Sequence, residues 1–214
     1  MAMDVDDQEA RRRSEFMQAL TTEHFALQSG RSATISESAG RSSLYMTTVS
    51  SAVVALALAA QVANLGTLFA LAILPVVFFL GLVTYGRLLQ TGVEDTIYAR
   101  AIGRIRRLYS QINPSRAEYF RDIHSDRAGL RAMGLFRRWW QQFLTAAAMV
   151  AMVNAVVAGA FVAIAIARSV NPPALVSVAI GGGAALLVGA SFYRHQRLAW
   201  NHVDQALPEE VTSG

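Results

Sequence analysis

The chain has 214 residues, yet it contains no cysteine and no lysine. Without cysteine it cannot form disulfides, thiolate metal sites or iron–sulfur clusters, and it cannot carry a lipoprotein anchor. All 19 basic residues are therefore arginine, which together with the excess of alanine and valine indicates a bacterial source with a GC-rich genome. Because of that bias, a single arginine is weak evidence for guanidinium chemistry.

Motifs of catalysis are also missing. The sequence has no phosphate-binding glycine loop, no His-Glu-x-x-His pair, no nucleophile elbow and no paired carboxylates within an apolar segment. Neither does an ionisable residue lie at the middle of such a segment, where ion-coupled transporters usually place one. We therefore expect a protein that is not an enzyme and has no catalytic residue, no metal site and no cofactor.

Four long apolar segments dominate what is present. They cover residues 44–65, 68–86, 139–167 and 174–193, and none has an Asp, Glu or Arg well inside it. About 20 helical residues cross a bilayer core of about 30 Å. The sequence thus predicts an all-α polytopic membrane protein with four transmembrane helices in two hairpins, together with cytoplasmic amphipathic helices. The predicted parts are an N-terminal helix (1–43), a first hairpin (44–86), an arginine-rich loop (87–138), a second hairpin (139–193) and a tail (194–214).

The arginines predict the orientation of the chain. Eleven lie between residues 87 and 138, whereas the loop around 64–67 has none and the loop around 168–173 has one. By the positive-inside rule, both termini and the 87–138 loop are cytoplasmic, and the membrane is the bacterial inner membrane. This placement accounts for the basic excess, so we expect no nucleic-acid partner. Aromatic residues at the same ends are expected in the headgroup zone: Tyr45, Tyr85, Trp139, Trp140 and Tyr193.

Residues 14–43 are expected to form an amphipathic helix before the first span. Its apolar residues at helical spacing are Phe16, Leu20, His24, Leu27 and Ile35. In the same segment Glu37 stands four residues before Arg41, which is the favoured order for an ion pair on a helix.

A second helix is predicted in the 87–138 loop. An apolar stripe follows helical spacing at Ile97, Ala101, Ile105, Leu108 and Ile112. The rest of its surface is basic, with Arg100, Arg104, Arg106 and Arg107. These arginines suit either anionic lipid headgroups or a cytoplasmic partner. The helix itself could instead pack as a bundle against the 14–43 helix. Asn113 and Pro114 are expected to start a further helix.

Small residues recur every four positions in three of the four spans, and such spacing lets helix backbones approach closely. We expect these faces to form tight interfaces, either between spans or between protomers of a homo-oligomer. The second span lacks such a ladder, so we expect it to face lipid. The predicted packing residues are Ala55, Ala59, Ala151, Ala155, Gly159, Ala163, Gly181, Ala185 and Gly189.

Few polar side chains lie within the spans. Asn154 is near the middle of the third span, and Thr47 and Ser51 are near one end of the first. Each could line an aqueous pore, or it could hydrogen-bond to a neighbouring helix.

The segment TTEHFALQSGRSATISE at residues 21–37, continuing into SSLY at 42–45, resembles small uncharacterised membrane proteins of actinobacteria with four spans. The resemblance covers the entry helix and the first hairpin. It implies a source and a topology but no activity.

Two functions are open at this point. The first is a homo-oligomeric channel or pore, with Asn154 or the Thr47–Ser51 group facing water. The second is a non-conducting scaffold or interaction protein that receives a partner or lipid signal through its arginine-rich helices. A hydrated path around Asn154 would favour the channel, whereas dry packing of the spans would favour the scaffold.

Overall fold

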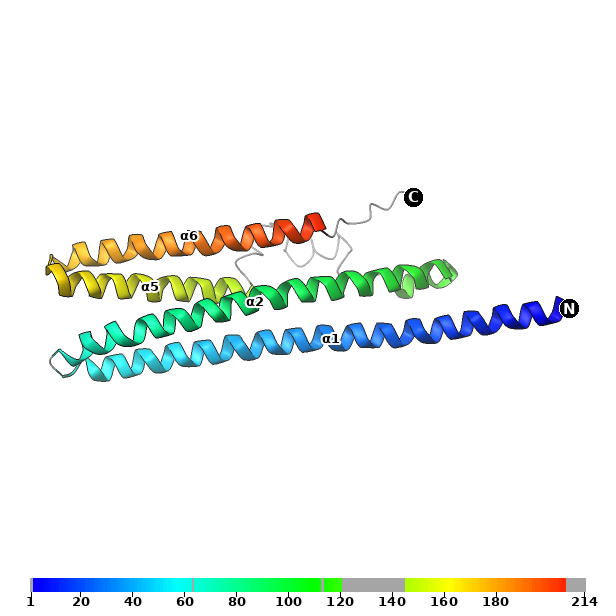
Figure 1. Ribbon diagram of the computed structural model, residues 1–214, viewed down its shortest axis with the longest axis horizontal. Helices are drawn as coiled ribbons and strands as arrows, with labels where there is room; N and C mark the ends of the chain where they lie inside the picture. Colours follow the sequence, from blue (N-terminus) through cyan, green and yellow to red (C-terminus); the bar gives the residue numbers. More distant parts are fainter. Residues whose placement is uncertain (1, 63, 113, 121–144, 207–214) are drawn as a thin grey trace. The chain divides into compact units, whose positions relative to one another are not determined.

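The computed structural model describes residues 2–62, 64–112, 114–120 and 145–206, and all regular structure in them is helical (Figure 1). Four helices are long and apolar enough to cross a membrane, which confirms that part of the predicted fold class. The predicted N-cap Asn113, residues 121–144 of the loop and third span, and the tail after residue 206 lie outside the described residues, whereas the helix expected from Pro114 begins there as a short 3₁₀ helix. The elements are α1 (Ala2–Ala59), α2 (Leu65–Ile112), the 3₁₀ helix η1 (Pro114–Phe120), α5 (Ala146–Val170) and α6 (Ala174–Ala206).

Asparagines shape both hairpin turns. Asn64 lies between α1 and α2 with φ of 62°, and Asn171 caps α5 with φ of 47°. Asparagine is one of the few residues that adopts this left-handed conformation readily. At the other end of α5, the Thr145 hydroxyl caps the helix by accepting a hydrogen bond from the Ala148 amide at 3.2 Å. The 25 residues of α5 extend about 37 Å, which is enough to cross a bilayer core.

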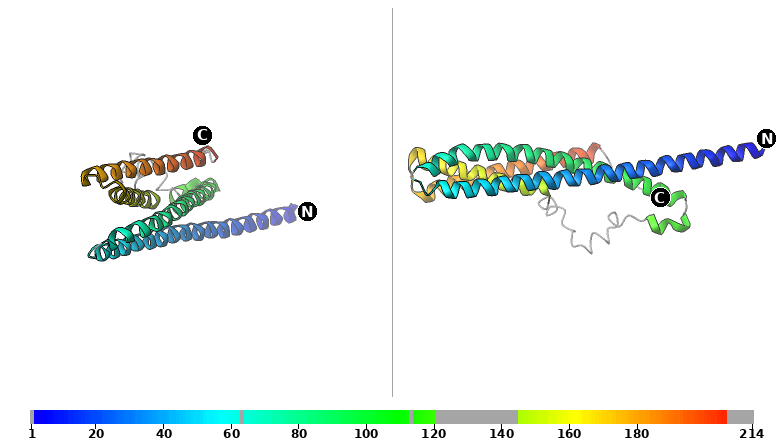
Figure 2. Two further views of the ribbon diagram at one scale, coloured as in Figure 1. Left: turned by 60° about the vertical axis from the view of Figure 1, so that its left-hand side comes forward. Right: turned by 90° about the horizontal axis from the view of Figure 1, so that it is seen from below.

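The chain divides into two compact units. The first comprises Met1–Ser36 and Glu94–Phe136, and the second comprises Glu37–Val93 and Arg137–Gly214. In the first unit the N-terminal part of α1 and the C-terminal part of α2 run antiparallel, side by side (Figure 2). Arg31 donates to Asp95 at 2.8 Å, and the His24 ring lies 6.3 Å from that of Tyr109 in an edge-on arrangement. This α1–α2 pair is the bundle that the sequence left as an alternative to lipid contact.

The packed face of α2 in the first unit differs from the predicted stripe. Ile102 and Ile105 are buried, whereas Ile97 and Ile112 are exposed. The packed residues follow the alternating three- and four-residue spacing of a coiled coil. Two tyrosines and an aspartate share this packed face with the two isoleucines. They are Asp95, Tyr98, Ile102, Ile105 and Tyr109.

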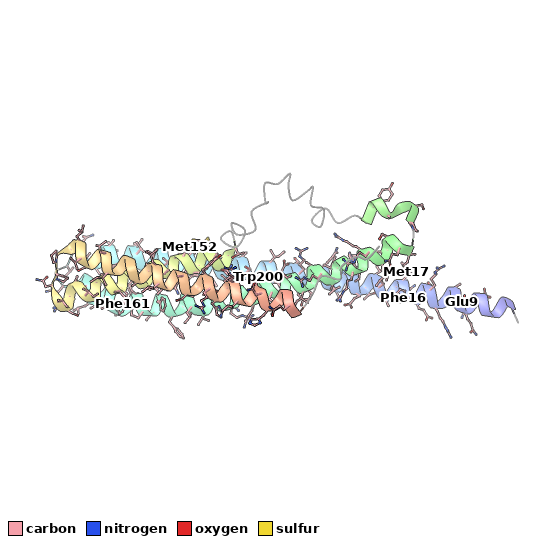
Figure 3. The ribbon with its side chains drawn as sticks, turned by 90° about the horizontal axis from the view of Figure 1, so that it is seen from above. Glu9, Phe16, Met17, Met152, Phe161 and Trp200 are labelled. Atoms are coloured by element: carbon pink, nitrogen blue, oxygen red, sulfur yellow. The ribbon has the colours of Figure 1, made fainter. Side chains whose placement is uncertain are left out.

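The N-terminal helix also buries fewer of its apolar residues than predicted. Phe16 is 52% exposed (Figure 3) and Ile35 is exposed, while the neighbouring Thr34 is buried. The Thr34 hydroxyl donates to the Arg31 carbonyl at 2.8 Å, so its burial leaves no unpaired donor. Apolarity alone therefore does not identify the packed face of this helix.

In the second unit, α2 contributes a large part of the buried core. Ala70, Leu74 and Val77 of the second span are buried, so the expectation that this span faces lipid is wrong for one of its faces. Its other face, with Val76 and Phe79, is exposed. The helix continues through Pro75. Bulky residues therefore pack one face of this span without a small-residue ladder.

Candidate functional site

A hydrogen-bonded cluster joins three helices inside the second unit. Asn154 of α5 donates through Nδ2 to the Phe78 carbonyl of α2 at 3.1 Å, and the Tyr45 hydroxyl of α1 donates to Asn154 Oδ1 at 3.1 Å. Asn154 is 0% exposed and Tyr45 is 1% exposed. We call the side chains of Tyr45 and Asn154 with the Phe78 carbonyl the polar clamp.

Gly81 makes room for the polar clamp. A Cβ added at this position would lie 2.5 Å from Cγ of Asn154 and 2.8 Å from the Tyr45 hydroxyl oxygen. Real Cβ atoms essentially never approach other atoms so closely. The glycine therefore lets the carboxamide sit against the α2 backbone, where it can reach the Phe78 carbonyl.

The clamp gives Tyr45 a packing role and bears on the role of Asn154. The Tyr45 ring is buried among helices, and its hydroxyl satisfies the amide oxygen of Asn154. The geometry at Asn154 is that of an interhelical hydrogen bond, with both ends of the amide paired to protein. Sequence reasoning missed Tyr45 and Gly81, because nothing in their local sequence signals a contact with α5.

Thr47 and Ser51 lie apart from the clamp and are exposed on α1. Ser51 lines a shallow hollow of about 390 Å³ with Ser50, Val54 and Ala55, while Ala59 is half-buried. The small residues of the first span thus line part of the outer surface of the described second unit.

The small residues of the third and fourth spans meet each other. A Cβ added at Gly159 would lie 2.6 Å from the Gly181 carbonyl oxygen and 2.8 Å from Cβ of Ala185. A Cβ at Gly181 would lie 2.7 Å from that of Ala163. These separations leave room only for hydrogen at the two glycines, so the α5 and α6 backbones are in direct contact. Other small residues of these ladders are near the same interface: Ala151 and Ala155 are buried, and a Cβ at Gly189 would lie 3.7 Å from that of Ala155.

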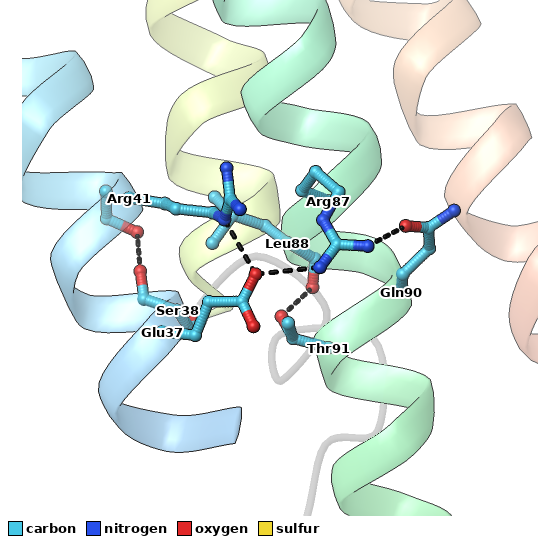
Figure 4. A network of polar contacts seen from close by, with 8 residues as sticks. Glu37, Ser38, Arg41, Arg87, Leu88, Gln90 and Thr91 are labelled. Atoms are coloured by element: carbon cyan, nitrogen blue, oxygen red, sulfur yellow. Dashed lines mark hydrogen bonds and ion pairs between the residues drawn. The ribbon is translucent and has the colours of Figure 1, made fainter. Parts of the chain in front are cut away.

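A charged cluster joins α1 to α2 at one end of the spans (Figure 4). Glu37 Oε1 accepts from Arg41 and from Arg87, each at 2.8 Å, and Arg87 also donates to Gln90 at 2.9 Å. The ion pair predicted between Glu37 and Arg41 is confirmed. Hydrogen bonds from Arg87, and to a smaller extent from Arg41, hold the pKa of Glu37 below its usual value of 4.5.

A second tyrosine links α2 to α6 near this end of the spans. The Tyr85 hydroxyl donates to the Phe192 carbonyl at 3.0 Å and lies 3.3 Å from Nδ1 of His195. The rings of Tyr85 and Phe192 are 4.6 Å apart and nearly edge-on. Like Tyr45, Tyr85 is buried among helices.

Four arginines of the first unit lie on α2 beside its packed face. Arg104 and Arg107 are exposed, and Arg100 and Arg106 are half-buried. We call these four residues the arginine face. Because Ile102 and Ile105 are buried in the same segment, the helix uses one side for packing and leaves basic groups at the surface.

Metal chemistry has no candidate in the described part of the chain, where no group of three or more His, Asp or Glu side chains is placed to hold an ion. No protein-family model, no curated protein and no solved structure matches the chain significantly. The function is therefore inferred from the geometry of the polar clamp, the charged cluster and the arginine face.

Proposed function

We propose that this protein is a non-conducting, membrane-embedded interaction protein. Its four spans form a packed anchor, and the arginine face receives a signal from an acidic partner or from anionic lipid headgroups. The exposed guanidinium groups of Arg104 and Arg107 favour such ligands, since each cation near an anionic membrane surface contributes about 1 kcal/mol. In this proposal the termini and the arginine face are on the cytoplasmic side of a bacterial inner membrane, because the arginine distribution favours that orientation.

The observation that carries the proposal is the state of Asn154. A residue that lines a water-filled path needs an exposed amide, but both ends of this amide are bonded to protein and the side chain is fully buried. Dry packing around the most central polar residue of the spans supports an anchor rather than a conduit.

A channel formed between copies of the chain is the second candidate. The exposure of Thr47 and Ser51 on α1 favours it, because small polar residues on an outer helix face could line a path where several protomers meet. In such a homo-oligomer α1, and not α5, would line the pore.

Flux from liposomes separates the two candidates. We expect liposomes that contain the wild-type protein to release no more entrapped potassium or fluorescent dye than protein-free liposomes. The same result is expected for liposomes that contain the Asn154→Leu variant. Flux that Ser51→Leu abolishes, while Asn154→Leu preserves it, would instead support the channel between copies. A circular-dichroism spectrum of each variant verifies that it is folded.

The arginine face is tested by photocrosslinking in cells. Gly103 lies between Arg100 and Arg104 in the sequence, and no atom comes within 4 Å of a Cβ added there, so it tolerates a benzoylphenylalanine. We expect a crosslinked adduct from position 103 that disappears when Arg104 and Arg107 are both changed to Gln. The matched control is the same probe at Gly183 of α6, where an added Cβ also meets open space. An adduct that survives loss of both arginines would contradict the proposed role of the arginine face.

A further inference from the structure

A groove of about 510 Å³ runs between α2 and α6 in the second unit. Its walls are mainly apolar side chains of the second and fourth spans, and one end carries polar groups. The residues that define it are Phe78, Leu82, Gly86, Leu187, Ser191 and His195.

The groove opens toward the outside of the helix pair. Leu187 is 73% exposed and Leu82 is 44% exposed, although both lie within apolar spans. In a membrane such surfaces face hydrocarbon, so the groove is filled from the bilayer.

A second protein helix is a poor match for these walls. Helices associate in membranes where small residues let the backbones approach, and here that contact is made elsewhere, between Gly159 and Gly181. Bulky walls of Phe78, Leu82 and Leu187 instead leave a slot that suits a narrow, flexible chain.

Hydrogen bonding fixes the chemistry at the polar end. The Tyr85 hydroxyl has a single hydrogen, which it donates to the Phe192 carbonyl. The contact with His195 therefore has Nδ1 as the donor and the tyrosine oxygen as the acceptor. Nε2 of His195 then carries the lone pair of the ring, so it can accept a hydrogen bond from a ligand hydroxyl but cannot donate one to a phosphate.

A positive charge lies at the same end. Arg194 is exposed, and among the described residues no hydrogen bond or ion pair engages it. It follows Leu187 by seven residues, about two helical turns, so both project from the same side of α6. Basic pockets between membrane helices are typical sites for anionic lipid headgroups.

We propose that the α2–α6 groove binds an anionic phospholipid. One acyl chain lies along Leu82, Gly86 and Leu187, the phosphate meets Arg194, and His195 is left to accept from a headgroup hydroxyl. This inference stands independently of the proposed function, because it concerns the spans and not the arginine face.

Native mass spectrometry of the full chain in detergent tests the groove, with phosphatidylglycerol and phosphatidylcholine titrated separately. We expect one phosphatidylglycerol to bind about fivefold more tightly than phosphatidylcholine, the ratio that corresponds to about 1 kcal/mol for one cation near the headgroup. Equal affinities for the two lipids would overturn the proposal.

A matched pair of substitutions locates the site. Gly86→Leu fills the groove, and it can do so without a clash because no atom lies within 4 Å of a Cβ added there. Gly183→Leu places the same side chain at an exposed, open position of α6 outside the groove. We expect Gly86→Leu to lose the tight lipid and Gly183→Leu to keep it. Equal binding by both variants would overturn the proposal, as would a change in protomer number caused by Gly86→Leu alone, since a second copy would then occupy the groove.

A second pair tests the headgroup contact. Arg194→Gln is expected to reduce phosphatidylglycerol affinity to that of phosphatidylcholine, whereas Arg197→Gln, an equal charge change at another exposed position of the helix, preserves the preference. Loss of the preference in both variants would reveal a general charge effect and would overturn the assignment to Arg194.

Discussion

The backbone of Gly81 lies directly against the Asn154 carboxamide, so closely that no other amino acid fits without displacing the amide. The pair joins α2 to α5 and sets the distance at which Asn154 reaches the Phe78 carbonyl. Glycine within a helix is otherwise unfavourable relative to alanine by about 1 kcal/mol. Its position opposite Asn154 explains why the helix retains it.

We predict that Gly81→Ala destabilises the protein although alanine is the better helix former. Its methyl group would displace Asn154 or Tyr45 and break the clamp, at a cost of about 1–3 kcal/mol typical of overpacked cores. Gly86→Ala is the matched control on the same helix, where the added Cβ meets open space and stability should rise by about 0.5–1 kcal/mol. Thermal unfolding in detergent measures both. Equal effects of the two changes would contradict the steric role of Gly81.

The Tyr45–Asn154 hydrogen bond is expected to appear as a coupling energy. In a double-mutant cycle with Tyr45→Phe and Asn154→Leu, we predict a coupling of about 0.6 kcal/mol, the average for hydrogen bonds between membrane helices. Tyr85→Phe combined with Asn154→Leu should be additive, because Tyr85 bonds to Phe192 and His195 instead. Unfolding in mixed micelles with increasing denaturing detergent gives the free energies. An equally strong coupling between Tyr85 and Asn154 would contradict the assignment of this coupling to the Tyr45–Asn154 hydrogen bond.

The charged cluster predicts a stability difference that depends on pH. The folded state lowers the pKa of Glu37, so its stabilising effect is complete above the ordinary value of 4.5 and is lost as the pH falls through the folded value. Glu37→Gln should therefore unfold at a lower temperature than wild type at pH 7, with the two converging in acid. A difference between wild type and Glu37→Gln that is constant from pH 7 to pH 3.5 would rule out this linkage.

The turn between α5 and α6 depends on the left-handed conformation of Asn171. We predict that Asn171→Ala costs about 1 kcal/mol, because a residue with an ordinary Cβ pays that steric penalty at positive φ. Asn171→Gly should be neutral or slightly stabilising. Asn201 is an exposed residue of α6. Asn201→Ala should instead stabilise the protein by about a few tenths of a kcal/mol, because alanine has a higher helix propensity than asparagine. Scanning calorimetry of the three variants gives the order, and an Asn171→Ala variant as stable as wild type would refute the argument.

Hydropathy was sufficient to locate the four helices that can cross a membrane, because a stretch of about 20 apolar residues has few other stable arrangements. The Glu37–Arg41 pair was also predictable, since four residues on a helix fix the geometry. The Tyr45–Asn154 and Glu37–Arg87 contacts were not, because their partners are 109 and 50 residues apart. Apolar spans carry little information about register or rotation, since nearly every face is equally hydrophobic.

The packed face of the first unit shows a related limit. Ile97 and Ile102 are equally apolar, yet only Ile102 is buried. Which of them turns inward depends on neighbours that hydropathy ranks as polar, namely Asp95, which pairs with Arg31, and Tyr98, whose ring lies 3.0 Å from the Cβ position of Gly30.

Direct contact between the backbones at Gly159 and Gly181 also limits how the second unit can move. Two helices that touch at their main chains cannot rotate about their own axes independently, since any added separation removes the dispersion contacts that hold them. The α5–α6 hairpin should therefore move as one rigid body. Any conformational change in the second unit would then take place at the interface between α2 and that hairpin, where larger side chains pack and hydrogen bonds can exchange partners.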